Sequence, residues 1–214
     1  MLAKDKIKLS AFLAIVFCII ANISVPVFAT DLGTLSYWYS NDTIIGRWDP
    51  SLSAITVYKQ KLNSNASFYF LDGISTACSN WDDVIGKQIS SGQSSSFSSA
   101  PIRYFGGTLS EVNEMGILTV PSSYNGLTAV YAYDEGTWTY GGSTKTGERV
   151  VQAIGAIIDW GHTANQYRNT CSHELGHALG WYGHSSSSYD VMYPNGTSIT
   201  SLSNSDKNHL SQVY

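Results

Sequence analysis

The sequence contains few charged residues. Asp, Glu, Lys and Arg make up 13% of its 214 residues, about half the share that is usual in soluble domains. The 12 basic and 16 acidic residues give no excess of positive charge, which argues against nucleic-acid binding because a basic face is expected there. Beyond the N-terminal leader there is no apolar run long enough to span a membrane. This composition suits a secreted protein without nucleic-acid partners.

The N-terminus has the pattern of a signal peptide. A start with three lysines precedes an apolar segment, residues 11–20, and Val27-Phe28-Ala29 provides the small residues of a cleavage site. An uncleaved membrane anchor is the alternative, since the apolar stretch is long for a signal. Loss of the predicted signal peptide, residues 1–29, would move the net charge from -4 to -6 and leave residues 30–214 as one domain. We therefore expect a secreted, extracellular monomer without stable membrane association.

Two cysteines remain beyond the leader, Cys78 and Cys171. A disulfide between them is possible in an extracellular setting, and two buried free thiols are the alternative. On a helix, Cys171 would lie about 200° around the axis from His173. Its side chain would therefore face away from any site that His173 helps to form.

Three of the five histidines lie within twelve residues, in the run His173-Glu174-Leu175-Gly176-His177-Ala178-Leu179-Gly180-Trp181-Tyr182-Gly183-His184. On a helix, His173 and His177 would be about 40° apart and about 6 Å along the axis, so both imidazoles can reach one zinc ion. Glu174 would lie beside that metal, where it can act as a general base on a bound water. Three histidines leave the fourth position for water, as in a catalytic zinc site.

These residues resemble the metzincin clan of zinc endopeptidases, and within it the matrixin-like enzymes of the secreted bacterial type. The family pattern is H-E-x-x-H-x-x-G-x-x-H followed by a turn that contains a methionine. His173, Glu174 and His177 match its first part. Gly180 matches the glycine, and Met192 in Val191-Met192-Tyr193-Pro194 resembles the turn methionine. The alternative is an ordinary amphipathic helix with surface histidines.

One spacing departs from the family pattern. The third histidine would stand at position 183, but the chain has Gly183 there and His184 one residue later. Because a glycine can absorb one added residue, we predict His184 as the third metal ligand beside His173 and His177. Asp190 is the alternative, since carboxylate oxygens also bind zinc.

No glutamate follows Glu174 in the chain. This argues against thermolysin-like enzymes, whose third zinc ligand is a downstream glutamate. The remaining downstream acids are Asp190 and Asp206. Asp206 is better placed at the start of the last helix, where a carboxylate is favoured by the helix dipole.

Hydrophobic periodicity predicts an α+β domain. Strand-like patterns cover residues 35–40, 101–105, 117–120, 127–133 and 149–160. Helical spacing covers about 67–85 and 164–179, and the serine-rich residues 90–99 are expected to form a loop. Residues 202–214 resemble the C-terminal helix of the metzincin family. The resemblance implies a metzincin-like catalytic domain, with a twisted, mostly parallel sheet of about five strands packed on two long helices. It further implies a C-terminal helix after the methionine turn, and an edge strand near 127–133 that a peptide could join.

The resemblance implies a secreted zinc-dependent endopeptidase that acts on peptide or protein substrates. One catalytic Zn²⁺ is the expected cofactor, and Glu174 is the expected catalytic residue, a general base for the zinc-bound water. Ca²⁺ is possible near Asp134, Glu135 and Glu148, but no calcium-loop spacing supports it. The alternative is a secreted binding or structural protein of metzincin fold with little or no proteolytic activity, which the late third histidine favours. A zinc hydrolase for other substrates is a third possibility.

Overall fold

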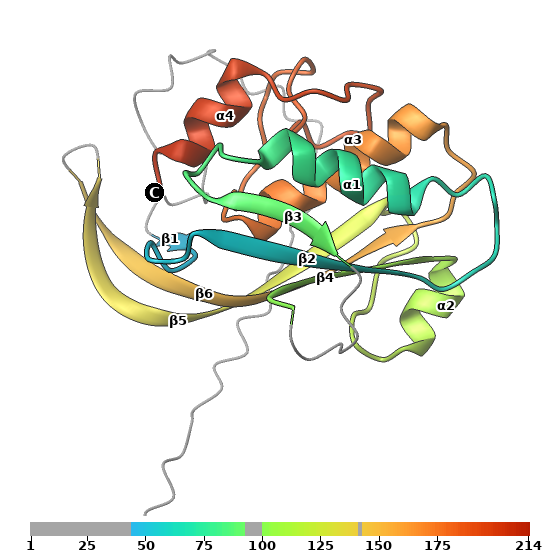
Figure 1. Cartoon of the computed structure of the whole chain (residues 1–214), viewed down its shortest axis with the longest axis horizontal. Helices are drawn as coiled ribbons and strands as arrows, with labels where there is room; N and C mark the ends of the chain where they lie inside the picture. Colours follow the sequence, from blue (N-terminus) through green and yellow to red (C-terminus); the bar gives the residue numbers. More distant parts are fainter. Residues whose placement is uncertain (1–43, 93–99, 141–142) are drawn as a thin grey trace, which may run out of the picture.

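The computed structural model describes residues 44–92, 100–140 and 143–214 (Figure 1). The predicted signal peptide, residues 1–29, and the predicted first strand, residues 35–40, lie outside these ranges. Within them, no helix is both long and apolar enough to cross a membrane.

A twisted six-stranded sheet runs through the domain (Figure 1). Its strands are β1 (Ile44–Arg47), β2 (Ala54–Lys61), β3 (Gln88–Gly92), β4 (Ile102–Gly107), β5 (Gly126–Tyr140) and β6 (Ser143–Ile158). The order is β1-β6-β4-β2-β3, and β5 pairs with β6 as well. Only the β5–β6 pair is antiparallel among the described strands. The expected mostly parallel sheet is present, with six strands rather than about five.

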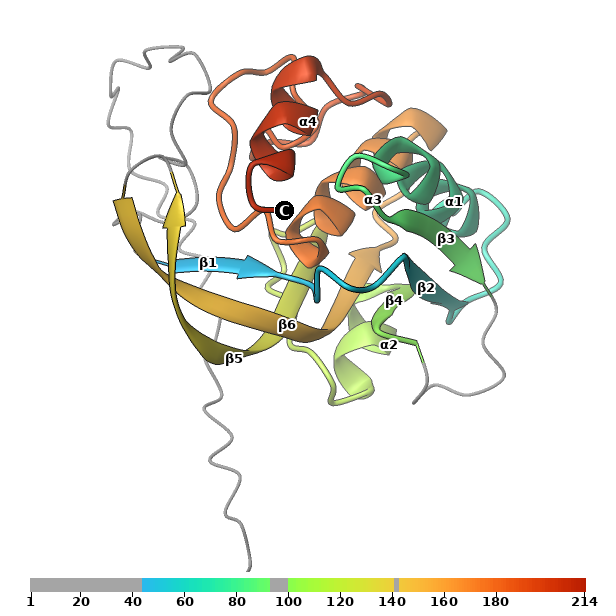
Figure 2. The ribbon, with the colours of Figure 1, turned by 60° about the vertical axis from the view of Figure 1, so that its left-hand side comes forward.

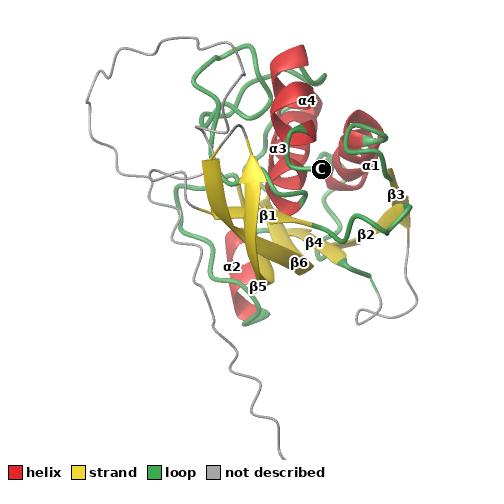
Figure 3. Cartoon of the chain, turned by 90° about the vertical axis from the view of Figure 1, so that its left-hand side faces the viewer, coloured by secondary structure: helices red, strands yellow, loops and turns green. Residues whose placement is uncertain are grey.

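Helices lie on both faces of the sheet (Figure 3). They are α1 (Phe70–Trp81), α2 (Leu109–Glu114), α3 (Ala164–Ala178) and α4 (Asn204–Ser211). α1, α3 and α4 lie on one face and α2 on the other, where it covers a small apolar cluster with Val112, Ala156 and Ile158. The main core lies between the sheet and the pair α1 and α3.

Some predicted elements are wrong. Residues 117–120 do not form a strand, because the N–H of Val120 donates to Asn113 Oδ1 (2.8 Å) and its side chain packs in the cluster under α2. Residues 90–92 belong to β3 rather than to a loop. β2 and α2 were not predicted, although Thr108 and Glu111 form a capping box that marks the start of α2.

The helix predicted near residues 67–85 ends earlier, at Trp81. Asp82 has an extended conformation, with φ -57° and ψ 132°, and its Oδ1 accepts a hydrogen bond from Ile89 N (2.8 Å) at the start of β3. The side chain of Trp81 is fully buried and donates through Nε1 to Ser172 O (2.8 Å). Trp81 is therefore a core residue that ties α1 to α3.

Both cysteines lie buried in the described core as free thiols. A Cβ atom at Gly73 would lie 2.6 Å from Cys171 Sγ, so this glycine allows α1 and α3 to approach closely. Burial raises the pKa of Cys78 to about 12 and raises the pKa of Cys171 well above its usual value. Of the two alternatives, the structure has the free thiols, with Cys171 directed towards α1.

Contacts from distant parts of the chain hold the end of α3. Trp48 Nε1 donates to Ala178 O (2.8 Å), and the hydroxyl of Tyr214 donates to Leu179 O (2.5 Å). The C-terminus therefore lies beside this helix end (Figure 2). Gly180 follows with φ 115°, and a Cβ there would lie 2.5 Å from Gly46 O. Only glycine fits this turn, which leads the chain towards His184.

Candidate functional site

Three histidine rings converge at the C-terminal half of α3. His173 and His177 lie one turn apart on the helix, and His184 lies on the loop that follows. The ring centroids of His173 and His177 are 4.7 Å apart, and each lies 5.1 Å from that of His184. One ring nitrogen from each histidine lies within 4.8 Å of the other two. In the described part of the chain, this is the group of side chains that could hold a metal ion.

Backbone carbonyls set the tautomers of two of these rings. His173 Nδ1 lies 2.9 Å from Val191 O, and His177 Nδ1 lies 2.6 Å from Trp181 O. A carbonyl oxygen can only accept, so each Nδ1 carries a proton and each Nε2 of the neutral ring has a free lone pair. Burial lowers the pKa of His173 to about 4 and lowers the pKa of His177 well below its usual value. Both rings are therefore neutral at neutral pH, as metal ligands must be.

The two Nε2 atoms of His173 and His177 face each other at 3.1 Å. Since both protons are on Nδ1, neither Nε2 can donate to the other, and two lone pairs meet. A cation between them would turn this repulsion into attraction. Two nitrogens bound tetrahedrally to one zinc ion at 2.0–2.1 Å would be about 3.3 Å apart. The spacing and the chemistry of these donors therefore fit zinc.

Asp190 lies apart from the histidine group. Its carboxylate accepts a hydrogen bond from Ser185 Oγ (2.5 Å), and its N–H donates to Ser187 O (3.1 Å). These bonds hold the loop after His184 together. Of the two candidates for the third ligand, the structure brings His184 and not Asp190 to the other two histidines.

Glu174 is buried beside the histidines, against β5. Its Oε2 accepts a hydrogen bond from Thr128 Oγ1 (2.7 Å), and its backbone carbonyl accepts one from the hydroxyl of Tyr104 (2.7 Å). Burial raises the pKa of Glu174 to about 7, although the hydrogen bond from Thr128 lowers it. A carboxyl group with such a pKa can both accept and release a proton near neutral pH.

Met192 lies against α3 beneath the histidines. A Cβ at Gly176 would lie 2.4 Å from Met192 Sδ, so this glycine lets the sulfur pack closely against the helix that carries His173 and His177. The carboxylate of Asp206 in α4 accepts hydrogen bonds from Val191 N (2.9 Å) and Met192 N (3.2 Å). Because Val191 O in turn accepts from His173, α4 helps to orient a ring of the histidine group.

Asp206 also forms a capping box with Ser203 at the start of α4, in agreement with its predicted position.

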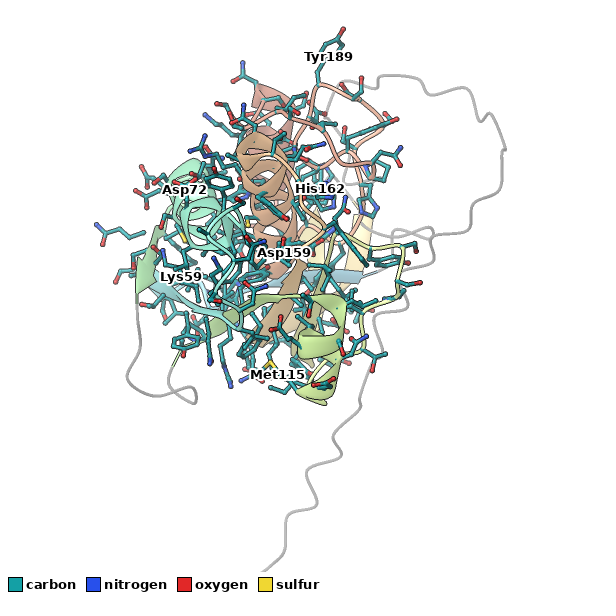
Figure 4. All side chains as sticks on the ribbon, turned by 90° about the vertical axis from the view of Figure 1, so that its right-hand side faces the viewer. Lys59, Asp72, Met115, Asp159, His162 and Tyr189 are labelled. Carbon is teal, nitrogen blue, oxygen red and sulfur yellow. The ribbon has the colours of Figure 1, made fainter. Side chains whose placement is uncertain are left out.

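The start of α3 is held by a separate polar network that includes Asp159 and His162, both labelled in Figure 4. Asp159 accepts hydrogen bonds from the hydroxyl of Tyr167 (2.8 Å) and from Asn65 Nδ2 (2.7 Å). His162 Nε2 lies 3.0 Å from Asn125 Oδ1 and is not part of the histidine group. This network fixes the N-terminal end of α3, opposite the end that carries the histidines.

The acids considered for calcium have other contacts. Glu135 forms an ion pair with Arg149 (2.6 Å), whereas Asp134 and Glu148 are neighbours only in the backbone register of β5 and β6. Among the described residues these acids do not form a group of three that could hold an ion. The calcium hypothesis gains no support from the structure.

β5 contains the segment predicted as the edge strand, residues 127–133. Among the described strands it pairs only with β6, so one of its edges is open.

Sequence reasoning missed the contribution of Gly126, Thr128 and Tyr104 to the surroundings of Glu174. Thr128 could have been found from the alternation of residues in a strand. It is a polar residue two positions before Val130, so both side chains face the core.

Comparison with known families matches residues 109–214 to the matrixins. The match spans α2, β5, β6, α3 and α4, and therefore contains all three histidines and Glu174. No curated protein matches the chain. The resemblance to matrixins is thus confirmed for residues 109–214, and at the level of the family it supports a metallopeptidase.

Proposed function

We propose that this protein is a secreted zinc-dependent endopeptidase. The convergence of His173, His177 and His184 beside the buried carboxyl group of Glu174 carries the proposal. The matrixin match supports the same class of enzyme. The three histidines would hold the metal, and a fourth coordination position would stay open, as catalytic zinc sites require.

Each residue of the site has a part in hydrolysis. When bound, zinc polarises the scissile carbonyl and lowers the pKa of a water molecule that it holds. Glu174 takes the proton of the attacking water and passes it to the leaving nitrogen, so the peptide C–N bond breaks while a C–O bond forms. The carbonyls of Val191 and Trp181 keep the rings of His173 and His177 oriented. The open edge of β5 binds the substrate backbone as an added strand.

The proposal includes secretion. Residues 1–29 have the pattern of a signal peptide, so the active protein would consist of residues 30–214 and act outside the cell as a monomer. Mass determination of the protein recovered from culture medium tests this part. Recovery of the protein from the membrane fraction with residues 1–29 still attached would contradict secretion.

Cleavage of an unfolded protein tests the activity. The protein without residues 1–29 should digest casein, chelation should stop the digestion, and zinc should restore it. Glu174→Gln should keep its zinc and lose about 10²–10⁴-fold in rate, because general base catalysis contributes that much. Asp72→Asn is the matched control, since Asp72 lies on the surface in an ion pair with Arg168. A zinc-loaded wild type that cleaves neither casein nor a peptide library would favour the binding protein instead.

A further inference from the structure

The first residues of β5 form the surface against which Glu174 rests. Alternate residues of a strand point to the same face, and Gly126, Thr128 and Val130 point towards α3. Val130 packs into the main core, whereas Gly126 and Thr128 lie against Glu174. A short stretch of the edge strand therefore determines where this carboxyl group lies.

Thr128 supplies a directed hydrogen bond to the carboxylate. Its side chain is buried, with 6% of the residue exposed, and its Oγ1 lies 2.7 Å from Glu174 Oε2 and 3.2 Å from Glu174 O. A hydroxyl has one proton to donate. Of the oxygens near the Thr128 hydroxyl, Glu174 Oε2 is the nearest, because the hydroxyl oxygen of Tyr104 lies 3.0 Å away and Glu174 O lies 3.2 Å away. The short distance and the charge of the carboxylate therefore favour Oε2 as the acceptor.

Gly126 provides the space for the other carboxylate oxygen. A Cβ at this position would lie 2.9 Å from Glu174 Oε1 and 2.8 Å from Glu174 Cγ. It would also lie 3.1 Å from Ala156 O on β6, so the strand could not move aside freely. Any side chain at position 126 would thus displace the carboxyl group of Glu174.

We propose that Thr128 and Gly126 are positioning residues for the general base. The inference rests on the proposed function, because it assigns these residues a part in the same hydrolysis. Thr128 holds Oε2, so that Oε1 is the oxygen that takes the proton from water and returns it to the leaving nitrogen. The hydroxyl of Thr128 keeps its own proton throughout and donates it to Oε2, whether or not Oε1 is protonated.

This arrangement links substrate binding to the chemistry. The edge of β5 that would bind the substrate backbone and the face that holds Glu174 belong to the same residues, Gly126 to Val130. The substrate strand and the general base are therefore placed relative to one rigid segment. Such orientation matters because a misplacement of about 1 Å can cost about a hundredfold in rate.

Two substitutions of Thr128 separate its hydroxyl from its volume. Thr128→Val keeps the shape and removes the hydroxyl, and we expect kcat to fall by about 10- to 100-fold while KM changes less than about threefold. Thr128→Ser keeps the hydroxyl, and it should recover kcat to within about threefold of the wild type. Zinc content should be unchanged in both. Thr137→Val, at an exposed position further along β5, is the matched control and should behave as the wild type.

Gly126→Ala gives an independent test at the second residue. It should lower kcat in the same range with zinc retained, because the added methyl group displaces the carboxyl group of Glu174. A readout without catalysis uses urea unfolding of the chelated protein. Thr128→Val should lower the unfolding midpoint more in the wild type than in Glu174→Ala, where the carboxylate partner is missing.

The outcomes are distinguishable. An active wild type that needs Glu174, together with full kcat in Thr128→Val, would overturn the positioning role and leave the proposed function intact. A Thr128→Ser variant as slow as Thr128→Val would do the same, since the hydroxyl would then not matter. An inactive zinc-loaded wild type would overturn both proposals.

Discussion

The third metal ligand can be identified by two matched substitutions. His184→Ala removes one of the three ring nitrogens that lie within 4.8 Å of one another, whereas Asp190→Asn changes a carboxylate bonded to Ser185. Loss of a group that only hydrogen-bonds to a metal ligand already lowers the metal affinity by about tenfold to a hundredfold. We therefore expect His184→Ala to weaken zinc binding by at least about a hundredfold, and Asp190→Asn by less than about tenfold.

This loss of affinity should appear in thermal unfolding. A hundredfold change corresponds to about 2.7 kcal/mol, and binding free energy adds to the stability of the folded state when zinc is in excess. In a domain of this size, 1 kcal/mol shifts Tm by about 2–4 °C, so the zinc-induced rise in Tm should shrink by about 5–11 °C in His184→Ala. For each protein, the difference between Tm with zinc and Tm without zinc is measured, and these differences are compared. The effect of either substitution on the metal-free protein then cancels.

Competition titration with a zinc chelator gives the affinities directly. If His184→Ala binds zinc as tightly as the wild type, or if the large loss occurs only in Asp190→Asn, the assignment of His184 is wrong. The carboxylate of Asp190 would then be the third ligand, and it would first have to leave Ser185.

Three further predictions follow from the packing of the domain. Gly180→Ala should lower the free energy of unfolding in urea by about 3 kcal/mol, because alanine is strained at φ 115° and its Cβ would lie 2.5 Å from a backbone carbonyl oxygen. The control Gly116→Ala, at φ 66° and in open space, should lower it by about 1 kcal/mol. Equal losses in the two variants would contradict the clash. Burial lowers the pKa of His209 from 6.5 to about 4, so the unfolded chain takes up the proton first as the pH falls. The contribution of His209 to stability is complete above pH 6.5, and roughly 3 kcal/mol of it is lost as the pH falls towards 4. In the chelated protein, His209→Phe should remove this part of the loss. Cys78 and Cys171 should resist alkylation by iodoacetamide at pH 8 in the native protein, because both thiols are buried and their pKa values are raised. Both should react after unfolding without reductant. If neither reacts after unfolding, the two cysteines form a disulfide.

Short-range spacing predicted the centre of the site. His173, Glu174 and His177 lie on one helix, and helix geometry alone places the two rings on one side with the carboxylate beside them. β4, β6 and α3 could be predicted for the same reason, since each has a continuous or periodic apolar pattern within a short segment. β2 has this pattern only in its first half, because Lys59 and Lys61 lie in its half-buried second half, and the sequence did not predict it.

Spacing alone left His184 and Asp190 as alternatives, because both follow Gly180 on a loop of unknown path. The path depends on contacts between distant residues. Gly180 fits against Gly46 O in β1, and Ser185 N donates to Met192 O (2.8 Å), which ties the loop to the turn under α3. No local pattern contains these contacts, so only the tertiary structure brings His184 to the other rings.

The surroundings of Glu174 depend entirely on the tertiary structure. Thr128 is 46 residues away in the chain, and the two side chains meet because β5 pairs with β6 and both pack under α3. The candidate metal ligands on α3 and the candidate proton acceptor Glu174 could be predicted from the sequence, since their chemistry and helical spacing are local properties. Local spacing does not set which oxygen of Glu174 is held or which side chain joins His173 and His177, because both positions depend on the packing of distant segments.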